Sequence, residues 1–236
     1  MNKLAWLVFV CACTKVDSSD ILTSGMHADI EAQGAADDTT SVTATLYLGN
    51  PINLNFIELT ADDQLLVTLG TSSKVMERTE LLNIVGYHAS FPTNAEGSQF
   101  EISLERSVDD GAPSSLATLP APFTILPPTA TSFSRAAAMT IDCDPAGSAG
   151  DQMRWRASGS CIDTKIDTFP GDSGSVTIPA SALTKRVAQQ GEQVPDSCSA
   201  TLEITRTREG ELDLHYGKGG SVVGTQVRTL SFTTTP

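Results

Sequence analysis

The sequence has few of the residues that build most zinc, nucleic-acid and phosphate sites. It contains three histidines and no Cys-x-x-Cys pair, so a zinc site is not expected. Lysine and arginine number 15 against 28 aspartates and glutamates, which gives a formal net charge of −13. Nucleic-acid backbones and anionic lipid surfaces are bound by clustered cations, so this balance argues against both as partners.

Sustained helical periodicity is also missing. Thr79–Val85 has the only plausible helical pattern, and it is too short to form an independent helix. Most of the chain instead alternates apolar and polar residues, which is typical of half-buried strands. The clearest predicted strands are 41–48, 65–69, 86–91, 99–105, 139–144, 153–157, 175–178, 198–205 and 222–232.

The N-terminus has the order of an export signal, in which Lys3 precedes nine apolar residues, 4–12. This run is too short to span a bilayer, which needs about 20 residues. Val10-Cys11-Ala12-Cys13 then resembles the lipobox of bacterial lipoproteins, which has an aliphatic residue at −3, a small one at −1 and a lipidated cysteine. Cys11 at −2 and Val10 at −3 depart from the commonest residues, and general signal-peptidase cleavage at the same bond is the alternative.

The lipobox resemblance implies a signal peptide at 1–12 and a lipid anchor, typically including palmitate, on Cys13. Two or more acyl chains anchor a protein stably, whereas one alone binds marginally. Thr14 and Lys15 follow the cysteine without an aspartate, and by family analogy this favours sorting to the outer membrane. The expected location is therefore the cell envelope, on its periplasmic or surface face.

The rest of the chain is predicted to hold a stalk and two domains. Residues 13–40 have little periodicity and read as a lipidated N-terminus and flexible stalk, with at most a first strand near 26–30. Prolines at 120, 122, 127 and 128 interrupt the strand pattern and place a domain boundary near Pro128. The predicted fold class is all-β, with β-sandwich domains at 41–128 and 129–236. The pattern resembles uncharacterised bacterial lipoproteins with tandem Ig-like sandwiches, a family that implies no particular activity.

Three cysteines remain after the predicted anchor, in a compartment that permits disulfides. Cys143, Trp155 and Cys198 resemble the Cys–Trp–Cys order of Ig domains, although Asp196 stands where the tyrosine corner would need Tyr. Cys143 is in phase with a core face, whereas Cys161 follows Ser-Gly-Ser and looks exposed. We therefore predict a Cys161–Cys198 disulfide with Cys143 buried and reduced, and Cys143–Cys198 stays open as the alternative.

Residues 171–175, Gly-Asp-Ser-Gly-Ser, resemble the nucleophile segment of chymotrypsin-like serine proteases. A serine hydrolase using Ser173 would need a histidine base and an orienting carboxylate. Of His27, His88 and His215, only His88 has the family's order in the chain, and its neighbours alternate like a plain strand. The favoured interpretation is a tight polar turn.

The remaining candidates are weaker. Acidic pairs such as Asp62-Asp63 lack the spacing of a calcium loop, and Lys218-Gly219-Gly220 lacks that of a phosphate loop. Trp155 and Tyr87 could stack on a sugar, but buried sandwich aromatics are commoner. We expect a non-enzymatic envelope lipoprotein with a structural or binding role and an unknown protein or glycan partner. The alternatives are a serine hydrolase and a glycan-binding module, and no catalytic residue, cofactor or metal is predicted.

Overall fold

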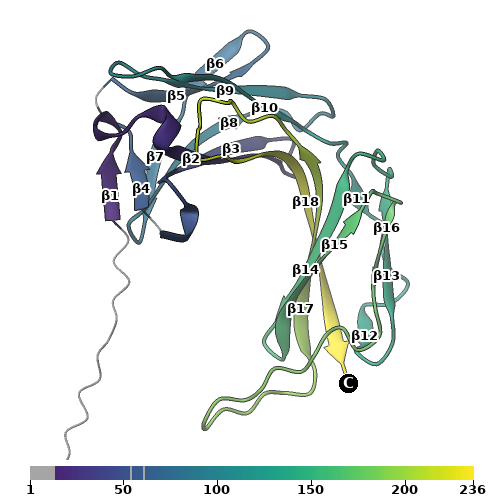
Figure 1. Ribbon diagram of the computed structural model, residues 1–236. Helices are drawn as coiled ribbons and strands as arrows, with labels where there is room; N and C mark the ends of the chain where they lie inside the picture. Colours follow the sequence, from purple (N-terminus) through teal and green to yellow (C-terminus); the bar gives the residue numbers. More distant parts are fainter. Residues whose placement is uncertain (1–13, 54, 61) are drawn as a thin grey trace, which may run out of the picture.

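The computed structural model describes residues 14–53, 55–60 and 62–236, and it is an all-β protein, as predicted. Figure 1 shows an arch in which two β-sandwich lobes are joined by long, bent strands. The described residues form no helix that is long and apolar enough to cross a bilayer. The strands are β1 (Thr14–Asp17), β2 (Met26–Gly34), β3 (Thr40–Leu48), β4 (Asn55–Glu58), β5 (Gln64–Leu69), β6 (Ser72–Val75), β7 (Glu77–Leu81), β8 (Ile84–Phe91), β9 (Gln99–Glu105), β10 (Ala112–Thr118), β11 (Thr124–Ile125), β12 (Ser132–Ser134), β13 (Met139–Asp144), β14 (Gln152–Gly159), β15 (Ile162–Pro170), β16 (Ser175–Ile178), β17 (Cys198–Glu209) and β18 (Gly220–Thr235).

One sheet runs through both lobes. Its 11 strands include the path β1-β4-β3-β2-β18-β17-β14-β15, with β7, β8 and β12 paired alongside. In the first lobe this sheet is faced by β10-β9-β5-β6, and in the second by β11-β13-β16. Each lobe is thus a sandwich, and the two sandwiches share one layer.

Two separate hydrophobic cores lie between these layers. The first contains Met26, Ala28 and Ile30 of β2 together with Phe100, Ile102 and Leu104 of β9, all almost fully buried. The second contains Met153, Trp155 and Ala157 of β14 together with Leu202 and Ile204 of β17. Alternate residues enter each core because successive strand side chains point to opposite faces.

The 16-residue strand β18 connects the two cores (Figure 1). Its first part pairs in parallel with β2, and its later part continues along β17. Val222 packs in the first core and Phe232 in the second, and both lie on the same face of the strand. Because β18 is longer than a single sandwich requires, the same strand contributes side chains to both cores.

The predicted stalk over 13–40 is wrong for the residues that the structure describes. Residues 14–17 and 26–34 form strands, and Met26, Ala28, Ile30 and Ala32 are buried. The strand near 26–30 was foreseen, but its length and its place at the centre of the sheet were not. Two of the four core-facing residues, Ala28 and Ala32, are small, which made the period-two pattern weak.

The predicted split into 41–128 and 129–236 needs two corrections. Leu119 belongs to the first core and Phe123 to the second, so the chain crosses between the cores before Pro128. Tyr216 and Val222 return to the first core from the C-terminal part of the chain. The two lobes therefore do not correspond to two consecutive segments of the chain.

Candidate functional site

Between the two cores, the core-facing positions of the shared sheet become polar. On β17 the buried series Ala200, Leu202 and Ile204 continues into Arg206 and Arg208. On β18, Gln226 is directly opposite Arg206 in the register, and Arg228 is opposite Ile204. The junction of the lobes is therefore built from side chains that need hydrogen-bond partners.

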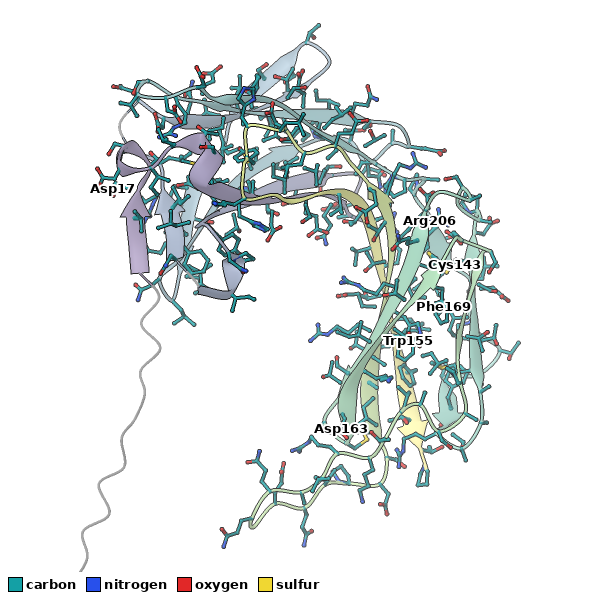
Figure 2. All side chains as sticks on the ribbon, viewed as in Figure 1. Asp17, Cys143, Trp155, Asp163, Phe169 and Arg206 are labelled. Atoms are coloured by element: carbon teal, nitrogen blue, oxygen red, sulfur yellow. A yellow bond between two sulfur atoms is a disulfide. The ribbon has the colours of Figure 1, made fainter. Side chains whose placement is uncertain are left out.

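Arg206 is fully buried at this junction and has partners for its guanidinium group. Its Nε donates to Asp172, whose side chain is also fully buried, and the two form an ion pair. Nη1 donates to the carbonyl of Ala121 and Nη2 to that of Pro145, both at 2.7 Å. Figure 2 places Arg206 at the end of the second lobe that is nearest the bend. One side chain thus connects β17, the crossover segment and two loops of the second lobe.

Arg208 and Gln226 join the same junction to the first lobe. Arg208 makes a two-pronged contact with the buried carboxylate of Asp151, at 2.8 and 3.1 Å. Burial raises the pKa of Asp151, but hydrogen bonds from Arg208 and Ser148 outweigh it and leave the pKa below its usual value. Gln226 donates to the carbonyls of Asn94 and Pro120. Arg208 Nη1 also donates to the carbonyl of Leu119, a residue of the first core, at 3.2 Å. The bonds to Leu119 and Asn94 therefore connect the junction to the first lobe.

A pocket of about 470 Å³ lies beside this junction. Its apolar wall includes Pro122, Phe123 and Ile125, and its polar lining includes Arg228 and Asp38. The guanidinium carbons of Arg206 and Arg228 lie 4.8 and 5.4 Å from the centre of the Phe123 ring, within range of a cation–π contact.

Arg228 is the cation that this pocket leaves available. Its Nη1 donates to the carbonyl of Val227 at 2.8 Å, and its Nη2 makes a long contact of 3.4 Å with Oε1 of Gln226. None of the described carboxylates forms an ion pair with it. Burial lowers the pKa of Arg228, and the charge of Asp38 partly opposes this change. The site can therefore offer a partly desolvated guanidinium to an anionic group.

The segment 171–175 is a structural turn at the edge of this junction. Asp172 accepts a hydrogen bond from the backbone N–H of Gly174 at 2.8 Å while it pairs with Arg206. Gly171 and Gly174 have φ of +77° and +78°, which glycine adopts readily. Ser173 is exposed and its hydroxyl makes a 3.4 Å contact with the carbonyl of Ser175. The carboxylate of the motif is thus committed to Arg206.

The histidines lie in the first lobe, away from Ser173. His27 contacts the carbonyl of Lys218 and the carboxylate of Asp29. His88 lies within β8 opposite Thr43 and Glu77, and His215 contacts Asp213 at 2.7 Å. The structure therefore does not bring the predicted candidate base His88 to Ser173.

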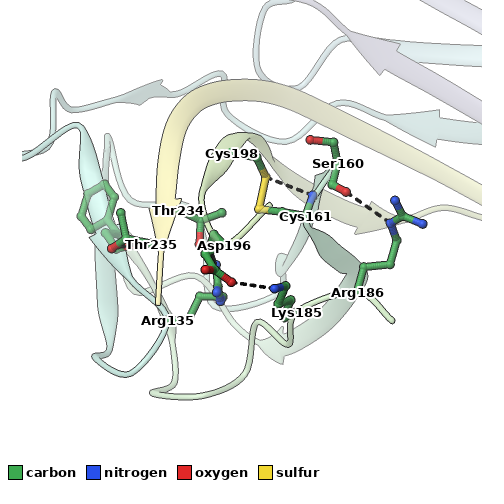
Figure 3. The surroundings of a disulfide bond; sticks show 10 residues. Arg135, Ser160, Cys161, Lys185, Arg186, Asp196, Cys198, Thr234 and Thr235 are labelled. Carbon is green, nitrogen blue, oxygen red and sulfur yellow. Dashed lines mark hydrogen bonds and ion pairs between the residues drawn. A yellow bond between two sulfur atoms is a disulfide. The ribbon is translucent and has the colours of Figure 1, made fainter. Parts of the chain in front are cut away.

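The cysteines pair as predicted. Cys161 and Cys198 form a disulfide with Cα atoms 5.8 Å apart (Figure 3). Cys143 is a buried free thiol. The expectation that Cys161 is exposed was wrong, since it is fully buried, and its carbonyl accepts a hydrogen bond from the backbone N–H of Arg186 at 3.0 Å. The disulfide joins the β14–β15 turn to the start of β17.

We predict that the Cys143 thiol is unreactive in the native protein. Burial, assisted by the charges of Asp172 and Asp142, raises the pKa of Cys143 to about 11, so very little thiolate exists near pH 8. A chain that begins at Thr14 should release almost no thionitrobenzoate from Ellman's reagent at pH 8, and one equivalent in 6 M guanidinium chloride. Cys143→Ser should release none in either condition. Rapid labelling of the native chain would contradict the assignment.

The aromatic residues considered for a sugar platform are not available to a ligand. Trp155 is fully buried in the second core, and Tyr87 is 4% exposed with its hydroxyl hydrogen-bonded to the backbone of β4 and Leu59. Figure 2 shows Trp155 within the second lobe. Among the described residues, no group of three or more His, Cys, Asp or Glu side chains could hold a metal ion. The predicted lipidation site, Cys13, and the predicted signal peptide lie outside the described residues.

Sequence reasoning missed the junction, although a signal was present. Arg206 and Arg208 continue the even-numbered, core-facing phase of 200–204, and Arg228 is in phase with Leu230 and Phe232. A charged residue at a core-facing position indicates a buried partner or a site. The identity of that partner, Asp172, could not be read from the chain because 34 residues separate the pair.

No protein-family model matches the chain, and no curated protein matches it in sequence. Solved structures with some likeness include the IG1 and IG2 domains of DIP-gamma, at 7% identity over 91% of this chain and 97% of that one, with a TM-score of 0.25. An I-band fragment of titin has 11% identity over 89% and 63%, with a TM-score of 0.23. The Bacteroides ovatus glucan-utilisation protein SGBP-B, in complex with a mixed-linkage heptasaccharide, has 10% identity over 94% and 65%, with a TM-score of 0.22. Likeness at this level carries no argument about function.

Proposed function

We propose that this protein is a cell-envelope lipoprotein, anchored through Cys13, whose body is a non-enzymatic binding module. The observation that carries the binding role is the pocket at the junction of the lobes, where Arg228 and the Phe123 wall meet. The buried Arg206–Asp172 pair stabilises the frame around this pocket. A preformed site of this kind binds without the entropy cost of ordering its walls.

The lining indicates the chemistry of the ligand. Arg228 suits a carboxylate or phosphate oxygen, and Phe123 and Ile125 suit an adjacent apolar portion. Asp38 lies in the same lining and disfavours a ligand with dense negative charge. A small molecule with one anionic group beside an apolar part fits these requirements best, and an N-acyl amino acid is a simple probe of this type.

Binding can be tested by calorimetric titration of the chain that begins at Thr14 with N-decanoyl-glycine. We expect saturable binding, with Arg228→Gln weakening it at least tenfold, because a charge-assisted hydrogen bond contributes about 1.5–3 kcal/mol. Arg154→Gln, an exposed arginine of β14, is the matched control and should bind like wild type. Equal binding by wild type and Arg228→Gln would place the ligand elsewhere.

Two further measurements separate the alternatives. Metabolic labelling with a fatty acid should mark the wild type and not Cys13→Ala, and an unlabelled wild type would remove the anchor from the proposal. A fluorophosphonate probe should label neither wild type nor Ser173→Ala. Labelling that is lost in Ser173→Ala would instead favour the hydrolase.

A further inference from the structure

The β7–β8 hairpin exposes apolar side chains at its tip. Leu81, Leu82 and Ile84 are 73%, 83% and 46% exposed. The strand β7 is exposed along its whole length, and among residues 14–53, 55–60 and 62–236 no segment buries it. Ile52, in the 3-10 turn Pro51–Asn53 just before β4, is 82% exposed. Large apolar residues grouped at one tip, as Leu81, Leu82 and Ile84 are, mark a surface that contacts something else.

The turn keeps leucine at a conformationally unfavourable position. Leu82 and Asn83 have φ of +51° and +66°, as in a type I′ hairpin turn. Such turns favour Asn or Gly at these positions, because a Cβ atom crowds the backbone in the left-handed region. Leu82 therefore carries a local cost, and at 83% exposed it is not buried against the described part of the chain. This combination points to a side chain whose contact lies outside the chain.

The tip lies level with the point where the chain enters the fold. β1 and β4 run in parallel with Thr14 opposite Asn55. Arg78 of β7 contacts Glu58 of β4 at 2.7 Å, and Glu80 contacts Lys15 of β1 at 2.5 Å. Since Glu58 is opposite Asp17, Arg78 lies near the end of β1 and Glu80 lies near its start. The tip of the hairpin, which follows Glu80, is therefore close to Thr14. In Figure 1, β1, β4 and β7 lie together at the end of the first lobe that is remote from the second.

We infer that the tip of the β7–β8 hairpin docks on the lipid bilayer that holds the N-terminal anchor. The inference rests on the proposed lipidation of Cys13, which is one residue, or about 3.5 Å of chain, from the start of β1. Such a short connection leaves no spacer between the acylated residue and the hairpin. The ion pairs Lys15–Glu80 and Arg78–Glu58 neutralise the charges beside the tip, which lowers the cost of bringing it to a zwitterionic surface.

The docking can be tested independently of lipidation. A chain that begins at Thr14 contains every described strand and both cores, so it retains the described body. An N-terminal hexahistidine tag would hold it on phosphatidylcholine vesicles that contain a nickel-chelating lipid. Asn83→Cys, labelled with NBD, reports the tip, and lipid-borne nitroxides report contact with the bilayer. Val187→Cys, labelled in the same way in an exposed loop of the second lobe, is the matched control.

We expect nitroxide quenching of the label at position 83 and none at position 187. Adding Leu81→Ser and Leu82→Asn should reduce the quenching several-fold, because less apolar surface is then buried in the bilayer. Leu82→Asn alone should raise Tm, since Asn tolerates the left-handed conformation, and a Tm of the double variant no lower than that of wild type excludes unfolding as the cause. An unquenched tip label, or quenching that the substitutions do not change, would overturn the docking. Concentration-dependent protection of the label without vesicles would assign the tip to a second copy of the chain instead.

The two proposals fail separately. If the wild type takes up no fatty acid but the label at position 83 is quenched, the Cys13 anchor is removed and the hairpin remains as an independent membrane contact. Fatty-acid labelling without quenching at the tip would keep the anchor and remove the docking.

Discussion

Replacing Asp172 by alanine should lower the free energy of unfolding by about 3–5 kcal/mol, because it leaves the guanidinium of Arg206 buried without its counter-charge. The two carbonyl acceptors, of Ala121 and Pro145, stay in place but cannot neutralise that charge. For a chain of this size, the loss corresponds to a fall in Tm of roughly 6–20 °C. Guanidinium denaturation followed by far-ultraviolet circular dichroism would measure it.

Two matched variants separate charge from geometry at this turn. Asp172→Asn keeps an oxygen for the N–H of Gly174 and removes only the charge, so it should cost less than Asp172→Ala. Ser173→Ala changes an exposed hydroxyl in the same turn and should alter the stability by less than about 0.5 kcal/mol. Equal stability of Asp172→Ala and wild type would show that the ion pair does not hold the junction.

Removing the Cys161–Cys198 disulfide, through replacement of both cysteines by serine, should cost about 3–4 kcal/mol. The bond closes a loop of 37 residues, and in the chain-entropy model its loss frees that loop in the unfolded state. The substitution should shift the denaturation midpoint of the oxidised protein to that of the reduced wild type. Cys143→Ser, which leaves the bond intact, is the control.

A midpoint that reduction leaves unchanged would contradict this prediction. A peptide map that joins Cys143 to Cys198 would contradict the pairing itself. The same map also tests the burial of Cys143, since a disulfide there would require that thiol to leave the second core.

The strands were largely readable from the sequence, and the turns that connect them less so. β9 and β16 have the bounds that alternation predicts, because one face of each is buried and the other is solvated. The β7–β8 turn was missed because Leu82 is an unusual residue at a left-handed turn position and Asn83 alone was too weak a signal, so the segment was read as a short helical pattern instead. β15 was not predicted, since its exposed outer positions include Ile166 and obscure the alternation.

The candidate site was less predictable than the fold. Arg206, Arg208 and Arg228 were visible as cations in phase with core positions, but their partners come from loops far along the chain. Conversely, the segment 171–175 drew attention through its resemblance to a protease motif. The structure shows that Asp172 of this segment forms an ion pair with Arg206 and that Ser173 is exposed to solvent.

The sequence by itself determined the all-β class and the core-facing phase of most strands, because side-chain alternation is a local property of an extended chain. It also favoured the disulfide, through the apolar phase of Cys143. Only the tertiary structure decided that β18 would serve two cores, that Asp172 would meet Arg206, and that Leu82 would project beside the entry of the chain. These features depend on which distant segments pair, and pairing is set by the packing of the whole sheet rather than by any local pattern.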